Sequence, residues 1–460
     1  MKGNKNKMRV HIRVKLSLIL ILINISFSVY SQDNHKSDTI PSFALGQCID
    51  YAMQHQPALN QSLINLTVTK INNRINLSGW LPQLNLSGNL LYYNQLPTTF
   101  IPNQANPAGP PVETHNGMSN TFIPALSASQ TLFNPQLVYA AKRAPLYIRQ
   151  AEQVTDSVKI NIVSTVSKSF YNLLLTLEQI NVLKEDTARL GRSVRDAYHQ
   201  YVGGIVDVTD YEQAIITLNN SKAQLKQQTE NAVPSYAALK QSMGCPPQEQ
   251  FNIAFDTSLM MQEITFDTTQ LLQYEKRIEY QQLQTLKNLQ HQLIDYNKLS
   301  FLPTVSAIYN YYYEYESNTS SALFNTAYPY SYMGLTFNFP IFTGFSRTEN
   351  LRKSKLQEQI VDWDVSRLKS QIYTEYTSAL AAYKSNLYNL SLLNDNENHA
   401  KNVYRIVSLQ YMQGIVPYLN IIVAESNLIT AEIGHINALF QLMSSKIDLE
   451  KAIGVISFNH

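Results

Sequence analysis

Two short stretches of the chain, about 210 positions apart, carry nearly the same sequence. They are Tyr201-Val-Gly-Gly-Ile-Val206 and Tyr411-Met-Gln-Gly-Ile-Val416. Each lies between two long segments with helical periodicity, and glycine is the residue that most readily ends a helix and reverses the chain. We therefore interpret the two stretches as matching turns of two helical hairpins, which makes the chain an internal duplication.

The duplication extends beyond the turns, although its displacement changes from about 209 to about 221 positions along the chain. The displacement changes only where we expect loops and their edges, because loops tolerate insertions. The matching pairs include Gly244 with Gly454, Leu132-Phe133 with Ile341-Phe342, and Trp80-Leu81-Pro82 with Phe301-Leu302-Pro303.

Each repeat is expected to contain one very long helix and one returning helix. The long helices should run from shortly after a strand pair to the glycine turn, which is roughly 65 residues or about 100 Å. Pro145 falls inside the first, so we expect a kink or a late start there. The returning helices are expected from about Asp210 to Met243 and from Asn420 to Ile453. The apolar seam of the long helices includes Val166, Phe170, Leu173, Leu190 and Ala197 in the first repeat and Leu390, Leu393, Tyr404, Val407 and Tyr411 in the second.

Four segments alternate between apolar and polar residues and are interpreted as β-strands. Strands of about ten residues with one apolar face and tyrosines at their ends are typical of outer-membrane barrels. The second segment, about Thr121 to Phe133, alternates less clearly. The apolar faces of the others carry Leu84, Leu86, Leu90 and Tyr92; Val305, Ala307, Tyr309, Tyr311, Tyr313 and Tyr315; and Met333, Leu335, Phe337, Phe339 and Ile341.

Four strands are too few to close a membrane barrel, because such barrels begin at about eight strands. An open sheet edge is not tolerated in lipid. If these are membrane strands, several chains must therefore share one barrel. Two chains would supply about eight strands and three about twelve, and the helices would form a coaxial tube.

The N-terminus is interpreted as a secretory signal peptide. Six basic residues precede an apolar stretch from Leu16 to Val29, which is shorter than the roughly 20 residues of a membrane-spanning helix. Val29-Tyr30-Ser31 then offers a cleavage site. The alternative is an uncleaved membrane anchor. No later segment reaches about 18 apolar residues, so any later membrane insertion must use strands.

Composition argues against a nucleic-acid-binding protein. Without the six basic residues of the first 31 positions, about 30 basic residues face 34 acidic ones, whereas nucleic-acid-binding domains are basic. The two cysteines, Cys48 and Cys245, could form a disulfide in a secreted protein. Nothing local forces them together, so two free buried thiols are an equal alternative.

The sequence carries no motif for catalysis or metal binding. The nine histidines fall in no metal-ligand spacing, and the common metalloprotease, P-loop and nucleophile-elbow motifs are absent. We therefore predict no enzymatic activity, no metal site and no cofactor. Two other classes stay open at this point. A periplasmic coiled-coil adaptor would explain the helices but not the strands, and a polysaccharide-binding protein should have more than two tryptophans.

The motifs, taken in order and duplicated, resemble the TolC-type outer-membrane efflux protein family over about residues 42–455. Trp80-Leu81-Pro82 resembles the family's strand start. Gln130-Thr131-Leu132-Phe133 and Phe339-Pro340-Ile341-Phe342 resemble its strand-to-helix junction. The two glycine turns, followed by Asp210 and Asn420, resemble its hairpin tips.

The resemblance implies a mainly helical fold with membrane strands. Three chains would share a twelve-stranded β-barrel in the outer membrane, and their helical hairpins would form a periplasmic α-barrel. The implied function is the exit duct of a tripartite efflux or type I secretion system. Such a duct passively conducts substrates that an inner-membrane pump and a periplasmic adaptor deliver. The implied partners are two further copies, the adaptor, the pump and outer-membrane lipid, but no nucleic acid.

The resemblance also implies roles for residues at the tips. Pore-constricting acids of the best-known members correspond to Asn420 and Val423, so this chain departs from the family pattern there. Asp210 is either a pore-lining acid or a helix N-cap, and both roles are compatible. The expected adaptor-docking residues are Gly203, Gly204, Ile205, Thr209, Gly414, Ile415 and Val416. The expected pore-constricting residues are Asp207, Asp210, Tyr418 and Asn420.

These expectations divide the chain into four parts. Residues 1–31 form the signal peptide, 32–244 the first repeat, 245–268 an equatorial linker and 269–460 the second repeat. Strands are expected at about 80–133 and 301–342, and helices at about 135–243 and 344–453.

Overall fold

The structure is a computed structural model, and it describes residues 42–103, 108–255, 264, 266–267 and 270–456. The expected signal peptide lies outside the described residues, as does part of the expected linker at 245–268. The chain forms two compact units. The larger unit contains Phe43–Glu249 and the chain from Ile253 onward, and it holds all the long helices and the four-stranded sheet described below.

Seven α-helices account for most of the described residues. The long helices α4 and α8 have 68 and 67 residues. Helix α4 begins at Pro135, where the Asn134 side chain accepts a hydrogen bond from the Gln136 backbone N–H (2.8 Å). It continues through Pro145, so of the kink or late start that we expected there, the late start does not occur. The helices are α2 (Leu45–His55), α3 (Pro57–Leu77), α4 (Pro135–Val202), α5 (Val208–Met243), α7 (Ile278–Leu299), α8 (Ser346–Met412) and α9 (Tyr418–Ile453).

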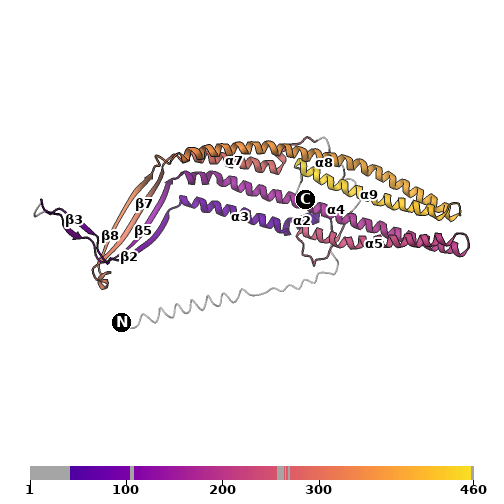
Figure 1. Cartoon of the computed structure of the whole chain (residues 1–460), viewed down its shortest axis with the longest axis horizontal. Coiled ribbons are helices and arrows are strands. Elements are labelled where there is room, and N and C mark those ends of the chain that lie inside the picture. The colour runs from indigo at the N-terminus through magenta and orange to yellow at the C-terminus, as the bar shows by residue number, and fades with distance from the viewer. Residues whose placement is uncertain (1–41, 104–107, 256–263, 265, 268–269, 457–460) are drawn as a thin grey trace, which may run out of the picture. The chain divides into compact units, whose positions relative to one another are not determined.

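Four of these helices form a row that continues from one end of the sheet (Figure 1), in which α3 packs on α4, α4 on α7, and α7 on α8. Helix α5 returns along α4, and α9 returns along α8 (Figure 1). The core lies largely where α4 of the first repeat packs on α9 of the second. Its fully buried side chains include Leu173, Leu174 and Leu190 of α4 and Leu442, Met443 and Leu449 of α9.

The main sheet is antiparallel, with the strand order β2-β5-β7-β8. Its register places Leu86 beside Leu126 and Leu126 beside Tyr311, so the predicted apolar residues share one face. The strands are β2 (Gln83–Tyr92), β5 (Asn120–Phe133), β7 (Thr304–Ser317) and β8 (Ala327–Asn338). Two smaller two-stranded sheets are also present. In one, β3 (Thr98–Ile101) pairs antiparallel with β4 (Val112–His115). In the other, the two-residue strands β1 (Ser42–Phe43) and β6 (Asn252–Ile253) pair with each other.

The fourth strand ends earlier than its alternating pattern indicates. Strand β8 stops at Asn338, so Phe339 and Ile341 lie in the connection to α8. Pro340 lies two residues after the strand end, and proline has no backbone N–H with which to continue the ladder. The alternation of apolar and polar residues therefore continues a few residues beyond the last hydrogen-bonded residue of the strand.

Two helices that precede the strand pairs were not expected from the sequence. Helices α3 and α7 begin at Pro57 and Ile278, which keeps the displacement of about 221 positions seen at Trp80. The buried face of α3 includes polar residues. Ser62 is hydrogen-bonded to Thr155 (2.8 Å), and Asn73 donates to the carbonyl oxygen of Ala144 (2.8 Å). Apolar periodicity therefore does not mark that face.

Gly244 and Gly454 end the returning helices, as predicted. Their φ angles are 72° and 76°, in the left-handed region that favours glycine. A Cβ atom at Gly244 would lie 2.8 Å from the backbone of His55 and Gln56, and one at Gly454 would lie 2.8 Å from the carbonyl oxygen of Lys276. Both glycines thus also allow close approach of a neighbouring segment.

Candidate functional site at the hairpin tips

The two tip turns have the same backbone geometry. In each, the N–H groups of a glycine and of the following isoleucine bond back to the last turn of the helix, which is the Schellman pattern. The φ angles of Gly204 and Gly414 are 70° and 72°. The bonds are Gly204 to Tyr201 (3.0 Å), Ile205 to Gln200 (2.9 Å), Gly414 to Tyr411 (2.8 Å) and Ile415 to Gln410 (2.9 Å).

The expected docking residues lie almost entirely on the surface of the tips. Gly203, Gly204, Ile205, Thr209, Gly414 and Ile415 are exposed, and Val416 is half-buried. Ile205 and Ile415 are 71% and 65% exposed, respectively, which is unusual for isoleucine. A Cβ atom at Gly204 or Gly414 would meet no described atom within 4 Å. These glycines are therefore required by their positive φ and not by crowding within the chain.

The acid that caps the first returning helix is Asp207. Its side chain accepts a hydrogen bond from the Thr209 N–H (3.2 Å), and α5 begins at Val208. Asp210 lies in the first turn of α5 and is half-buried, so the N-cap role considered for it belongs to Asp207. In the second repeat Pro417 takes the cap position, where the described structure has no side-chain cap bond.

Two tyrosines of the second repeat are buried at the tips, in a cluster that joins the hairpins. Tyr411 and Tyr418 are 4% and 1% exposed. Burial, with Asp210 and Asp196 nearby, raises the pKa of the Tyr411 hydroxyl to about 12. Neither hydroxyl has a hydrogen-bond partner among the described residues. The buried members of the cluster are Ala197, Ala214, Tyr411, Tyr418 and Ile421.

The structure thus separates the four residues that we expected at a pore constriction. Asp207 and Asn420 are exposed, Asp210 is half-buried, and Tyr418 points into the packed tip. In this arrangement Tyr418 holds the two hairpins together and presents almost no surface. Asp207, Asp210 and Asn420 are the expected residues with a surface that another chain or a solute can reach.

Sequence reasoning missed an ionic cluster inside the hairpins. Arg189 of α4 forms ion pairs with Asp186 of the same helix and with Glu425 and Glu432 of α9. Two signals could have shown that Glu425 is buried, although neither points to Arg189 as its partner. Glu425 stands in the three–four spacing of a seam that includes Tyr418, Ile421 and Leu428, and the duplication aligns it with an isoleucine, Ile215.

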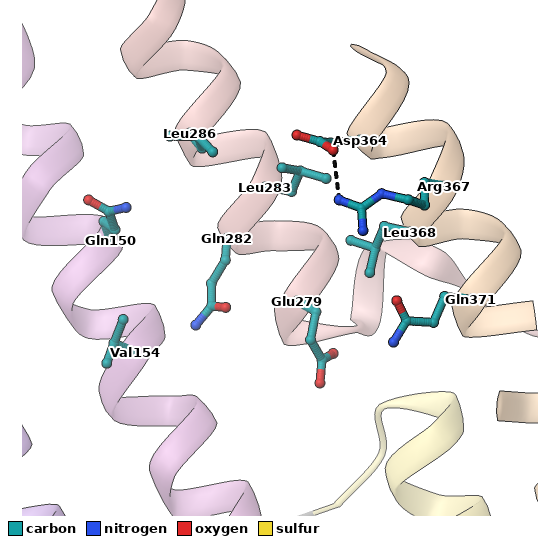
Figure 2. A pocket seen from close by; sticks show the side chains of 10 residues that line it. All are labelled: Gln150, Val154, Glu279, Gln282, Leu283, Leu286, Asp364, Arg367, Leu368 and Gln371. Atoms are coloured by element: carbon teal, nitrogen blue, oxygen red, sulfur yellow. Dashed lines mark hydrogen bonds and ion pairs between the residues drawn. The ribbon is translucent and has the colours of Figure 1, made fainter. Parts of the chain in front are cut away.

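A cavity of about 360 Å³ lies between α4, α7 and α8, away from the tips. Figure 2 shows the leucines Leu283, Leu286 and Leu368 beside the ion pair of Asp364 with Arg367 (2.7 Å). It contains none of the expected site residues. Its lining also includes Glu279, which is paired with Arg277, and the glutamines Gln150, Gln282 and Gln371.

The remaining expectations concern metals, thiols and membrane helices. Among the described residues, no group of three or more histidine, cysteine or acidic side chains is suited to a metal ion. Cys48 and Cys245 are buried free thiols, and burial raises their pKa values to about 12 and about 11. Within the described ranges, no helix is long and apolar enough to cross a membrane.

Comparisons with known proteins agree with this arrangement. A family model described as outer membrane efflux protein matches residues 48–245 and 275–455. The outer membrane protein TolC of Vibrio cholerae is 21% identical over 355 residues, which cover 74% of this chain and 78% of that protein. The crystal structure of CusC is similar with a TM-score of 0.74 at 17% identity, covering 92% of this chain and 95% of that one. The Campylobacter jejuni CmeC outer membrane channel has a TM-score of 0.71 at 19% identity, covering 90% and 87%.

The family match spans most of the chain, and the fold, the duplication and the tip turns are consistent with it. The chain belongs to the outer membrane efflux protein family. It is an outer-membrane exit duct for efflux, and its helical part lies in the periplasm. The alternative of a periplasmic adaptor without a channel leaves the four-stranded sheet unexplained.

Proposed function

We propose that three copies of this chain assemble into one continuous channel that conducts cargo passively from the periplasm to the outside. An inner-membrane pump supplies the cargo and the energy, and a periplasmic adaptor docks at the hairpin tips. The observation that carries the proposal is a four-stranded sheet and a four-helix row that both end in open edges.

The sheet edges support shared assembly. Among the described strands, β2 pairs only with β5, and β8 pairs only with β7. Every residue of β2 is exposed, as is nearly every residue of β8. Unpaired edges are costly in lipid, where backbone groups find no water. Pairing of β8 with β2 of the next copy satisfies both edges, and three copies give a barrel of about twelve strands.

The helix edges support the same assembly. Helix α3 lies at one end of the row, next to β2 in the chain, and it exposes Ile64, Val68, Ile71 and Ile75 at three–four spacing. Helix α8 lies at the other end, following β8, and it exposes Leu356, Ile360 and Trp363 at the same spacing. Apolar stripes of this kind are typical of helix–helix packing. Joining α8 to α3 of the next copy buries both stripes and closes the helical row.

The tips support adaptor docking. Each presents an exposed isoleucine beside a glycine with open space around it, so a partner helix can approach the turn closely. Between the two turns, the buried tyrosines fix the relative position of the hairpins. A preformed apolar surface of this kind favours binding, because little conformational entropy is lost on docking.

The tips are also our proposed constriction. Asp207, Asp210 and Asn420 have reachable surface there, and a threefold assembly repeats each three times around the axis. Repeated carboxylates attract cations and repel one another, at about 1 kcal/mol for a pair 4 Å apart even in bulk water. A cation preference is therefore expected of the closed channel.

The docking proposal is tested by charging the exposed isoleucines. Ile205→Glu combined with Ile415→Glu should abolish efflux in the native host, because two carboxylates would have to be buried in an apolar interface. Both side chains are exposed in the chain itself, so assembly should be normal on cross-linking. Leu271→Glu, at an 84% exposed position outside the tips, is the matched control and should leave efflux unchanged. Normal efflux with both tip carboxylates present would place docking elsewhere.

A further inference from the structure

The largely buried arginine Arg189 connects the two hairpins, about three helical turns from the tip turn of the first hairpin. The Arg189 guanidinium of α4 lies 3.5 Å from Glu425 and 3.4 Å from Glu432, both on α9. It also lies 3.5 Å from Asp186 on its own helix. Its side chain is 15% exposed, and those of Asp186 and Glu425 are each 1% exposed. The ion pairs therefore bridge the first repeat to the second in a region from which water is largely excluded.

Three carboxylates share Arg189 as their ion-pair partner within 4 Å. Arg192 also faces Glu425 and Lys401 also faces Glu432, but only as longer-range charges. Burial of a carboxylate without a close partner is strongly unfavourable. The cost of burying the Asp186 carboxylate is partly offset by Ser221 of α5, whose hydroxyl donates a hydrogen bond to it (2.6 Å). The other groups that face Glu425 are Arg192 of α4, Tyr404 of α8 and Tyr418 of α9.

Glu425 is the carboxylate with the least support. Neither of its oxygens receives a hydrogen bond from any described residue, and its ion pair with Arg189 is long. It lines a cavity of about 650 Å³ together with Asp186, Ser221 and Ser426. Burial, reinforced by the Asp186 charge, raises the pKa of Glu425 to about 7, even though Arg189 opposes the shift.

We propose that Glu425 is a proton-binding site that sets how firmly the two hairpins are held together. The proposal rests on the proposed function, because it assigns a regulatory input to the tips of the channel. Protonation removes the charge of a buried carboxylate that accepts no hydrogen bond from any described residue in the packed interface. Separation of the hairpins hydrates Glu425 and lets it ionise freely.

The direction of the pH effect follows from the raised pKa. The packed hairpins bind the proton more tightly than separated ones, in which the pKa of Glu425 returns toward 4.5. The proton therefore stabilises the packed state fully at a pH below 4.5, the pKa of Glu425 in the separated hairpins. This stabilisation is lost as the pH rises through about 7, its pKa in the packed hairpins. Between pH 6 and pH 8 the ratio of separated to packed hairpins should rise about tenfold.

The test measures the distance between the hairpins directly. Spin labels on cysteines introduced at Ile205 and Ile415 report on the two tips in the purified full chain, because Cys48 and Cys245 are buried. Pulsed electron paramagnetic resonance at pH 6 and pH 8 should show the tenfold rise in the separated population. Glu425→Gln should remove the pH dependence and hold the tips packed at pH 8. Glu230→Gln, at an exposed acid of α5 paired with Lys226 on the same helix, is the control and should keep the rise.

Two results would overturn the proposal. One is an equal separated population at both pH values in the otherwise unmodified chain. The other is an undiminished rise in Glu425→Gln and also in Glu425→Met, an apolar variant of similar size that is included in case the amide is poorly accommodated. The distance measurement uses neither adaptor nor pump. Loss of adaptor docking in the efflux assay would therefore refute the proposed function without deciding the role of Glu425.

Discussion

Tyr201 and Tyr411 occupy the same position in the two repeats, yet one is 41% exposed and the other 4% exposed. Both accept the hydrogen bond of the turn glycine at nearly the same distance. The backbone of the tip has therefore been kept in both copies, whereas the packing of its side chains has diverged. Tyr201 at the first turn is exposed to solvent, whereas Tyr411 at the second turn packs between the two hairpins.

The helices that leave the two turns differ in the same way. Helix α5 starts with an Asp207 cap and Val208, which is 38% exposed. Helix α9 starts with Pro417 and the buried Tyr418. One end is stabilised by a local hydrogen bond and the other by a hydrophobic core. The two repeats have thus kept the same turn geometry, whereas the interactions that stabilise the helix after the turn differ between them.

The sharpest test of this difference is truncation of the two tyrosines. Tyr411→Ala should destabilise the tips by about 3–5 kcal/mol, the usual cost of removing a buried aromatic side chain. Tyr201→Ala should cost less than about 0.5 kcal/mol, as surface changes usually do. Hydrogen exchange at the amides of Ile205 and Ile415, which are hydrogen-bonded to the preceding helix at the two turns, measures both, because local opening reports the stability of each tip. Equal protection in the two variants would mean that the two tyrosines contribute equally to the stability of the tips.

The turn glycines should respond alike in both repeats. Gly204→Ala and Gly414→Ala should each cost about 1–2 kcal/mol, because a left-handed backbone brings Cβ close to the following carbonyl oxygen. Asparagine tolerates this conformation better, so Gly204→Asn and Gly414→Asn should cost less. Exchange rates at Ile205 and Ile415 give the comparison. A large cost at one turn only would mean that the shared hydrogen-bond pattern does not carry the stability of both.

The smallest effect is expected at the helix cap. Asp207→Ala should destabilise the start of α5 by about 1 kcal/mol, whereas Asp207→Asn keeps an acceptor oxygen and should be nearly neutral. Pro417→Ala removes no cap bond from α9. In planar bilayers Asp207→Asn also separates the two roles of this residue. A weaker cation preference at unchanged stability would indicate a charge in the pore, and unchanged selectivity would leave Asp207 a cap alone.

Much of the fold could be predicted because its elements repeat and are strongly periodic. The long helices and the four strands follow from three–four steps and from alternation, and the glycine turns follow from their duplication. The row helices α3 and α7 were missed because polar residues such as Ser62 and Asn73 contribute to a buried face. Tertiary packing, which the linear pattern does not encode, decides which side of α3 is covered.

The candidate site was only partly predictable for a similar reason. The exposed isoleucines and glycines follow from the turn itself, because a Schellman cap fixes which groups point outward. Tyr418 was assigned to the constriction because it follows the turn. Its three–four spacing to Ile421 and Glu425 instead places it on the buried face of α9. A buried charge such as Glu425 depends on an arginine more than 230 positions away, and single-sequence reasoning has no means to pair the two.

The central claim is that the open edges of one chain are closed by two further copies. Native mass spectrometry of the purified protein in mild detergent tests this most directly, because it counts the chains in each intact assembly. We expect a single dominant species of three chains. A folded, stable single chain or a dominant dimer would contradict it, since two chains supply only eight of the twelve strands that the proposed barrel needs.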